Sequence, residues 1–308
     1  MRAPGWDEAT AGEGLRDRAA LDVPLYVGPL VTVGRWRCPV ESPHFVDSGP
    51  AGAFFFCFPR TAVWIQHAGH QPFVADPNVV TFYNKGQEYR RRPLAPEGDH
   101  GDWFAVAPAV IAETLAAFEP AAADRHERPF AFTHGPSDPA TYLLQRAVFE
   151  HASRESRPDA LFIEETVLAV LERLAEASLG PEKPHVSGSR GRDLSEAARA
   201  VLASRFPEGL TLSDIAASVD TSVFHLARVF RRETGTTLHA YRNQLRLRTG
   251  LERLADAGTD LLDLALSLGY SSHSHFTESF RRAFGETPSM VRGCLTSRRT
   301  RELVAGLR

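Results

Sequence analysis

The chain has 308 residues, of which 43% are hydrophobic and 24% charged, and its formal net charge is −3. This length suits two domains better than one, and the composition is that of an ordinary soluble globular protein. No apolar run reaches membrane-spanning length, and residues 1–22 lack the apolar segment of a signal peptide. Three scattered cysteines are too few for a disulfide framework, so we expect a reduced, cytoplasmic protein without a membrane partner.

Charge divides the chain into two unlike parts. Residues 190–308 contain 18 Arg against 13 acidic residues, whereas residues 1–189 contain 17 Lys and Arg against 25 acidic residues. The sign changes inside a Gly-, Pro- and Ser-rich stretch, which is typical of a linker. A basic half beside an acidic half indicates a polyanion-binding domain next to a domain with another task. We therefore expect a flexible N-terminus, a first domain, a linker, a second domain and a tail at residues 1–22, 23–179, 180–191, 192–293 and 294–308.

The first domain is expected to begin as β structure and to end as helices. Short apolar or alternating runs at 53–58, 62–67 and 79–83 alternate with turn residues, which favours a sandwich or a small barrel. Helical spacing follows at 109–118, 139–151 and 160–178. Asp159 is a plausible cap for the last of these helices, and Leu161 marks its apolar face. These helices pack within the chain or against a second subunit.

The second domain is expected to be entirely helical. A first amphipathic helix includes Leu194 and Leu202 and ends before Pro207. Thr211 or Ser213 can cap the next helix, and residues 238–257 are expected to form one long helix.

Residues 212–235 and 261–285 repeat one pattern on either side of that long helix. Their first parts recur at an offset of 49 residues and their second parts at 50, so the second copy has a longer turn. Small residues stand where two helices would cross (Ala216 and Ala265), and apolar residues recur on the inner face of the second helix. Each copy is thus expected to be a helix-turn-helix, which inserts its second helix into the major groove.

The same residues resemble a known family of DNA-binding proteins. The run from Ser222 to Gly235 resembles the first recognition helix of the AraC/XylS transcriptional regulators, and the run from Leu264 to Pro288 resembles their second unit. Tyr241 and the Arg246-Leu-Arg stretch on the joining helix also fit. The resemblance covers about 100 residues, from Leu194 to Arg292. Two units in tandem with the closing Gly-x-Thr-Pro make it highly specific.

The resemblance implies a sequence-specific regulator that binds double-stranded DNA. It implies that base contacts come from Phe224, Ala227, Arg228, His273, Ser274, Thr277 and Glu278. We assign contacts to the DNA backbone to His225, Arg231, Arg232, Arg281 and Arg282. Arg228 has the chemistry for a bidentate contact to guanine. Glu278 and Thr221 depart from the residues common at these positions, so we expect the first unit to supply most of the base discrimination.

For the first domain the resemblance implies a cupin-like β-barrel that binds a small effector, followed by helices that make a homodimer. The full expectation is an α+β two-domain protein, with two helix-turn-helix units joined by a long helix in the C-terminal all-α domain. The stretch 74–90 looks like a barrel segment of such regulators. An activator would also contact RNA polymerase. The residues that we expect to line the effector pocket are Cys57, Trp64, His67, Tyr83 and Trp103.

The sequence leaves two alternative functions to compare with that of a DNA-binding regulator. A cupin-type enzyme or metal-binding protein would use histidines such as His44, His67, His70 and His100, but the His-x-His motif with a following Glu is missing. A regulator that repairs alkylated DNA needs a cysteine-rich zinc site, which three dispersed cysteines do not supply. We expect no enzyme activity, no cofactor and no metal. Cys38 and Cys57 are redox-sensor candidates, although buried inert thiols are the default.

Overall fold

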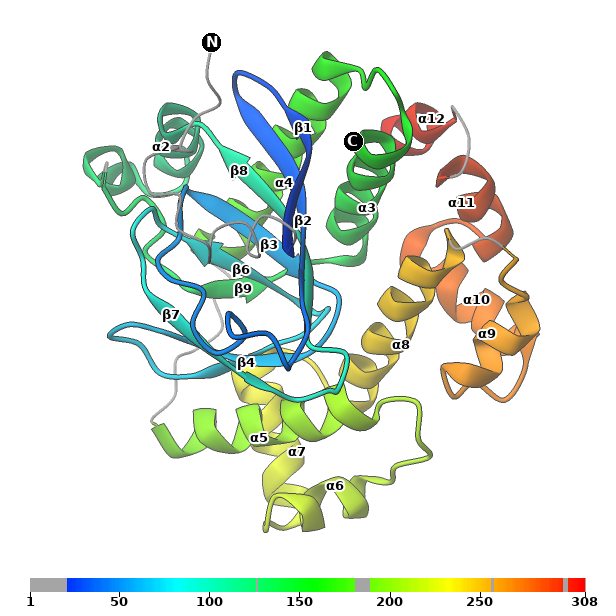
Figure 1. Cartoon of the computed structure of the whole chain (residues 1–308). Helices are drawn as coiled ribbons and strands as arrows, with labels where there is room; N and C mark the ends of the chain where they lie inside the picture. The colour runs from blue at the N-terminus through cyan, green and yellow to red at the C-terminus, as the bar shows by residue number, and fades with distance from the viewer. Residues whose placement is uncertain (1–20, 126, 181–188, 256–257, 296–298, 308) are drawn as a thin grey trace.

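The computed structural model describes residues 21–125, 127–180, 189–255, 258–295 and 299–307 (Figure 1). Strands dominate the first hundred of these residues and helices follow to the end. The first half is therefore a mixture of sheet and helix, and the second half is helical, as the sequence predicts. The flexible N-terminus expected at residues 1–22 lies outside the described residues, apart from its last two positions.

Two antiparallel sheets form the first half. The larger has the order β1-β2-β8-β3-β6-β9 and the smaller has the order β5-β4-β7. The bounds are β1 Asp22–Val27, β2 Val31–Cys38, β3 Phe55–Pro59, β4 Val63–His67, β5 Phe73–Ala75, β6 Val79–Tyr83, β7 Tyr89–Pro93, β8 Asp99–Val106 and β9 His134–Pro136. The runs predicted at 53–58, 62–67 and 79–83 correspond to β3, β4 and β6.

The sheets face one another instead of closing into one barrel. Cys38 of β2 shares an apolar cluster with Val63 and Ile65 of β4, which places the two sheets in contact. Among the described residues, strand pairing stops at β1 and β9 in one sheet and at β5 and β7 in the other. A barrel requires hydrogen bonding that continues around the whole ring. The predicted closed, cupin-like barrel is therefore replaced by two stacked, open sheets.

Helices cover the larger sheet. The chain leaves β8 through α2 (Pro108–Ala116) and η1 (Pro120–Asp124), and returns after β9 through α3 (Pro139–Arg154) and α4 (Ala160–Leu179). Asp138 and Asp159 cap α3 and α4 by accepting hydrogen bonds from backbone amides, which confirms the cap expected at Asp159. Leu161 is 67% exposed, so its placement on the buried face was wrong. α3 and α4 pack on each other and bury their apolar faces in the main core.

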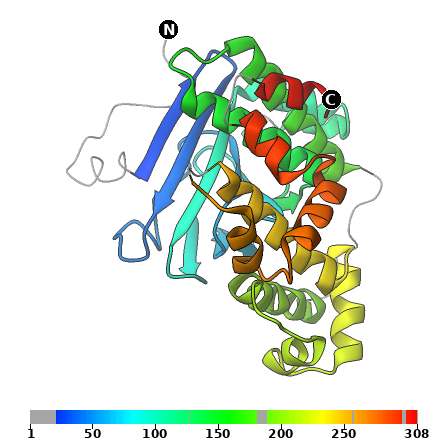
Figure 2. The same cartoon turned by 90° about the vertical axis from the view of Figure 1, so that its right-hand side faces the viewer.

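The second half contains eight helices within the described residues. They are α5 Ser189–Arg205, α6 Leu212–Ser218, α7 Val223–Thr234, α8 Leu238–Leu254, α9 Leu261–Ser267, α10 His273–Phe284, α11 Pro288–Leu295 and α12 Thr300–Ala305. α6 with α7 and α9 with α10 form the two predicted helix-turn-helix units, and α8 joins them as the long helix (Figures 1 and 2). Residues 256 and 257, which the sequence assigns to that long helix, lie outside the described residues.

Local sequence signals set the ends of these helices. Thr211 caps α6 through a capping box in which Asp214 bonds back to the Thr211 amide, so Thr211 rather than Ser213 is the cap. The side chains of Ser222 and Ser272 cap α7 and α10 by accepting hydrogen bonds from the backbone amides of His225 and His275. Both of these helices end at a glycine in the left-handed conformation, which residues with a side chain rarely adopt. The pattern repeated in the sequence thus includes the residues that begin and end each of these helices.

The expected boundaries differ from the structure at two points. Most of the linker predicted at 180–191 lies outside the described residues, and its last three positions already belong to α5. The tail predicted at 294–308 contains α12, whose Leu303 and Val304 are buried in the main core. α12 packs on α3, so this segment returns to the first half of the chain (Figure 2).

Two clusters of buried polar side chains join the halves. In the first, the Tyr241 hydroxyl of α8 donates to Asp76 at 2.6 Å and accepts from Arg199 Nε of α5 at 2.8 Å. Arg199 also pairs with Glu196 at 2.6 Å and donates to the carbonyl of Val74 at 2.6 Å. Burial raises the pKa of the Tyr241 phenol, so this hydroxyl keeps its proton and remains a donor.

The second cluster surrounds Glu252, three turns further along α8. The Tyr142 hydroxyl donates to Glu252 at 2.8 Å, and Arg146 pairs with the same carboxylate at 2.8 Å and with Asp102 at 2.7 Å. Arg60 reaches Glu252 at 2.7 Å. Since both ends of α8 are bonded to the first half, the long helix is fixed against it at two points.

Candidate nucleic-acid interface

The outer face of α7 exposes one large aromatic side chain and one cation together. Leu226, Val229 and Phe230 point inward and are buried, which turns the opposite face toward solvent. Phe224 is 76% exposed. The guanidinium carbon of Arg228 lies 6.0 Å from the centroid of its ring, within range of a cation–π contact. The structure therefore brings Phe224 and Arg228 together on one exposed face.

The remaining residues assigned to DNA contacts in the first unit lie around that face. Ala227 is half-buried beside Phe224, and His225 has an exposed side chain while its amide donates to the Ser222 cap at 3.2 Å. Arg231 and Arg232 are exposed in the last turn of α7. Arg232 also pairs with Glu233 at 3.0 Å.

In the second unit the outer face of α10 has a different chemical character. Phe276, Phe280 and Phe284 are buried beneath it. The outward residues are polar, and they are His273, Ser274, Thr277 and Glu278. The Thr277 hydroxyl lies 3.4 Å from His273 Nε2, so these two side chains are close neighbours.

Glu278 neutralises two cations of its own helix. It accepts from Arg281 at 3.0 Å and lies 3.4 Å from Arg282, at spacings of three and four residues. The hydrogen bond from Arg281 is the main reason why the pKa of Glu278 falls below its ordinary value. Both arginines were assigned to contacts with the DNA backbone. To make those contacts they would have to break their ion pairs with Glu278. The first unit has Arg228 at the corresponding position, so the two outer faces differ by two units of charge there.

Four of the five residues expected to line an effector pocket lie close together between the sheets. Cys57 of β3 pairs with Trp103 of β8, and Tyr83 lies 4.8 Å from His67, measured between ring centroids. Trp64 lies on the opposite face of β4 from His67 and packs against the cluster that includes α5. The expectation that Trp64 shares a pocket with the other four does not fit this arrangement.

Burial between the sheets shifts the pKa values of two titratable groups so that their neutral forms are favoured. Burial lowers the pKa of His67 to about 3, and Nδ1 of this ring lies 2.8 Å from Gln87 Nε2. Burial also raises the pKa of Cys57 well above its ordinary range, which disfavours the reactive thiolate. Cys38 is a buried thiol whose pKa is raised for the same reason. These environments match the inert-thiol interpretation.

The described residues do not provide a set of ligands for the metal-binding alternative. Among the described residues there is no group of three or more His, Cys, Asp or Glu side chains arranged to hold a metal ion. Of the four histidines considered, His67 already bonds to Gln87, and it lies among aromatic rings. In the same parts of the chain, no helix is both long and apolar enough to cross a membrane.

The residues that join the two halves could not be predicted from the sequence. Arg199, Tyr241 and Asp76 lie far apart in the sequence, and Arg199 occupies an otherwise ordinary helical position. Local periodicity carries no signal for such a contact. The sequence marks Tyr241 on the joining helix through the family resemblance, but it does not indicate which residues Tyr241 contacts.

Comparison with known proteins agrees with this geometry. Residues 215–293 match a family described as a helix-turn-helix domain. Over 85 residues, 28% of this chain, the sequence is 35% identical to the probable transcription factor PqrA of Proteus vulgaris, and the match covers 70% of that protein. The right origin-binding protein of Escherichia coli (strain K12) is 34% identical over 83 residues, which are 27% of this chain but only 29% of that protein.

A solved structure is similar to about a third of the chain. A transcriptional regulator with an AraC-type DNA-binding domain from Chromobacterium violaceum is 26% identical, with a TM-score of 0.34. The alignment covers 36% of this chain and 98% of that chain. The family match at residues 215–293 lies wholly within the C-terminal helices.

Proposed function

Because this chain belongs to the AraC/XylS family of transcriptional regulators, we propose that α7 and α10 enter adjacent major-groove segments of one promoter site. The chain is a DNA-binding regulator with two helix-turn-helix units, and the proposal concerns how it recognises its site. If only one unit bound DNA, the exposed outer face of the other recognition helix would contact nothing. Two capped helices of equal length on one rigid connecting helix support the use of both.

In the first unit we assign base contacts to Phe224, Ala227 and Arg228. The exposed pair of Phe224 and Arg228 is the observation that carries this assignment, because both side chains project from the outer face of the helix that a helix-turn-helix places in the major groove. The guanidinium can donate two parallel hydrogen bonds to guanine, worth about 1–3 kcal/mol of discrimination. Phe224 can contact a thymine methyl group or a sugar.

In the second unit the proposed base contacts are His273, Ser274, Thr277 and Glu278. Their side chains are shorter or acidic, and Glu278 holds Arg281 and Arg282 close to itself. A carboxylate on this face repels phosphates and is suited at most to the amino group of cytosine. The second unit would thus contribute less affinity and would mainly anchor and space the first.

The proposed backbone contacts are cationic or polar groups at the edges of the two faces, namely His225, Arg231, Arg232, Arg281 and Arg282. Contacts to phosphates fix the register of a protein on DNA and do not distinguish sequences. They also release counterions, so the affinity should fall steeply as salt is added.

For the first half we propose a sensing role for residues 23–179 and a DNA-binding role for residues 192–293. A small effector would bind in the sandwich near His67, Tyr83, Cys57 and Trp103. The hydrogen bonds from Tyr241 to Asp76 and from Tyr142 to Glu252 support coupling between the sensing half and the DNA-binding half. A shift of the sheets on effector binding would act on both ends of α8. Homodimer formation, contact with RNA polymerase and action as an activator belong to the same proposal.

The Arg228→Ala variant tests the recognition role directly. Binding-site selection from random duplexes should give a motif for the wild-type protein and a motif relaxed at one base pair for the variant. Arg253→Ala is a suitable control, because Arg253 is an exposed arginine of α8 outside both outer faces. An unchanged motif for Arg228→Ala would remove this residue from base recognition.

A further inference from the structure

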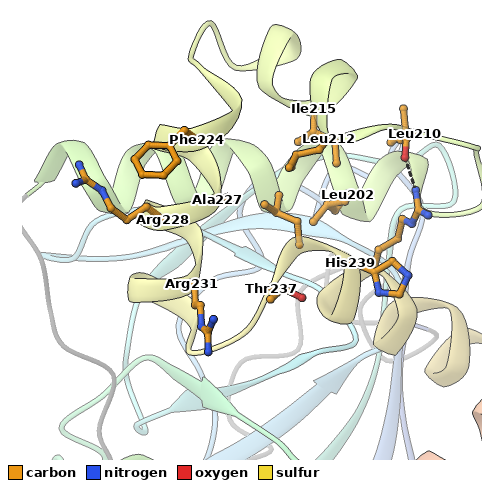
Figure 3. A pocket seen from close by; sticks show the side chains of 12 residues that line it. Leu202, Leu210, Leu212, Ile215, Phe224, Ala227, Arg228, Arg231, Thr237 and His239 are labelled. Atoms are coloured by element: carbon orange, nitrogen blue, oxygen red, sulfur yellow. Dashed lines mark hydrogen bonds between the residues drawn. The ribbon is translucent and has the colours of Figure 1, made fainter.

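The first helix-turn-helix unit contains a cavity beside its recognition helix. The cavity has a volume of about 600 Å³ and opens between α6, α7 and the start of α8, above α5 (Figure 3). Its lining residues are Leu202, Leu210, Leu212, Ile215, Phe224, Ala227, Arg228, Arg231, Thr237, Leu238, His239 and Arg242. The volume falls in the range of small-molecule sites, which is roughly 300–1,000 Å³.

The inner wall of the cavity is hydrocarbon. Leu202, Ile215 and Leu238 are buried side chains, and they come from three different helices. Leu212 stands at the edge of the same wall and remains 37% exposed. Figure 3 shows Leu202, Leu212 and Ile215 gathered at this wall of the hollow. Such a wall favours a ligand with an apolar body, because burying that body removes its surface from water.

The rim of the cavity is positively charged. Its three cations are Arg228 and Arg231 of α7 and Arg242 of α8. The polar ring of His239 of α8 also lines the cavity (Figure 3). Arg242 Nη1 donates to the carbonyl of Leu210 at 2.7 Å, which leaves four of the five N–H groups of a guanidinium for other partners. None of the twelve lining residues is acidic. The charge therefore selects an anionic head group.

The second unit provides a comparison within the same chain. Glu278 and Ser289 stand where the first unit has Arg228 and His239, at an offset of 50 residues. The carboxylate of Glu278 also draws Arg281, the counterpart of Arg231, into an ion pair. An anion would meet a negative charge there. The combination of apolar wall and cationic rim thus belongs to the first unit.

We propose that this cavity binds a small amphipathic anion, an aromatic or aliphatic hydrocarbon body with one carboxylate. Phe224, Ala227 and Arg228 line the cavity and also belong to the face assigned to DNA. A bound ligand would occupy the same side chains and would compete with DNA at the first unit. The second part of the inference rests on the proposed function, whereas ligand binding itself does not.

Ligand binding is tested on the full chain with 2-naphthoate as the probe, measured by isothermal titration calorimetry. The expected result is one site per chain, with binding of the neutral 2-naphthamide weaker by about tenfold, because it lacks the charge-assisted hydrogen bonds to arginine. The Leu212→Trp variant fills the edge of the cavity and should weaken 2-naphthoate binding by about tenfold.

Leu262→Trp is the matched control, because Leu262 is a 49% exposed leucine on α9 that does not line this cavity. It should bind 2-naphthoate like the wild type. Leu212→Gln provides a second variant at an exposed position, should Leu212→Trp fail to fold. The proposed site would be overturned if the chain did not bind 2-naphthoate, or if it bound 2-naphthamide as tightly as 2-naphthoate. It would also be overturned if both Leu212 variants bound 2-naphthoate as tightly as the wild type does.

Competition is tested by fluorescence anisotropy with a labelled duplex that carries the selected motif. With 2-naphthoate at ten times its own dissociation constant, competitive binding should weaken DNA binding by about elevenfold. At the same 2-naphthoate concentration Leu212→Trp should show only about a twofold effect, because its affinity for the ligand is about tenfold lower, and Leu262→Trp should keep the full effect. An unchanged DNA affinity in the presence of bound 2-naphthoate would refute competition. Failure to bind any duplex would refute the proposed function and leave the calorimetric result standing.

Discussion

Replacement of Tyr241 by Phe removes one oxygen atom from the buried contact between the first half of the chain and the first helix-turn-helix unit. The hydroxyl donates to Asp76 and accepts from Arg199, and both of these partners are charged and buried. The phenyl ring keeps the packing of Tyr241 against Phe230, whose ring centroid lies 5.4 Å away. The substitution thus isolates the two hydrogen bonds from the apolar core.

The expected loss follows from the partners that remain. A hydrogen bond to a charged group contributes about 1.5–3 kcal/mol to folding. Asp76 keeps the backbone amide of Asn78 at 2.8 Å, and Arg199 keeps Glu196 at 2.6 Å, so neither charge is left without a partner. Taking the lower value for each of the two lost bonds, we expect the free energy of unfolding to fall by about 3 kcal/mol.

Tyr270→Phe is the matched control in the second unit. Tyr270 is equally buried, but its hydroxyl donates at 2.8 Å to the neutral amide of Asn243, so we expect a loss of about 1 kcal/mol. Both variants are compared with the wild type by urea denaturation of the full chain, followed by circular dichroism at pH 7. If Tyr241→Phe loses no more stability than Tyr270→Phe, the hydrogen bonds to Asp76 and Arg199 do not stabilise the joined halves more than an ordinary buried hydrogen bond.

Three further substitutions test charge. Glu278→Gln should raise the affinity for DNA several-fold in anisotropy at low salt, because it frees Arg281 and Arg282 for phosphates; unchanged affinity would contradict the weak role of the second unit. Arg232→Ala should reduce the slope of log affinity against log salt by about one, and an unaltered slope would exclude a phosphate contact. Burial lowers the pKa of His67 from 6.5 to about 3, so its neutral form favours folding above pH 6.5 and this contribution is lost as the pH falls. We expect a loss of about 2 kcal/mol between pH 7 and pH 5 in urea denaturation, and His67→Gln should remove that part of the pH dependence.

The helices from α5 to α10 could be predicted one by one, because their signals are local, whereas α11 and α12 were not predicted. Thr211, Ser222 and Ser272 act within three residues of their own positions, and the apolar residues of each unit recur at helical spacing. The ion pairs of Glu278 with Arg281 and Arg282 also lie within one helical turn, and such spacing is visible in a sequence. The assignment of Glu278 to a base contact overlooked this pairing.

For the first half, only the fold class could be predicted from the sequence. Strand runs such as 79–83 are visible, but nothing local shows that β6 pairs with β3 and β9 and not with a strand that would close a barrel. Register and partner depend on contacts between residues far apart in sequence. The cavity of the first unit has the same origin, because Leu212 and His239 are brought together only by the turn of the chain around α7.

The return of α12 to α3 has a consequence for synthesis of the chain on the ribosome. α3 ends at Arg154, and the residues of α12 that bury its surface follow roughly 150 positions later. At about 5–20 residues per second, this face of the nascent β-sheet half stays uncovered for about 8–30 s. During that time its apolar residues are accessible to chaperones and to other nascent chains. The burial of Leu303 and Val304 therefore makes completion of the first half depend on residues that are translated after both DNA-binding units.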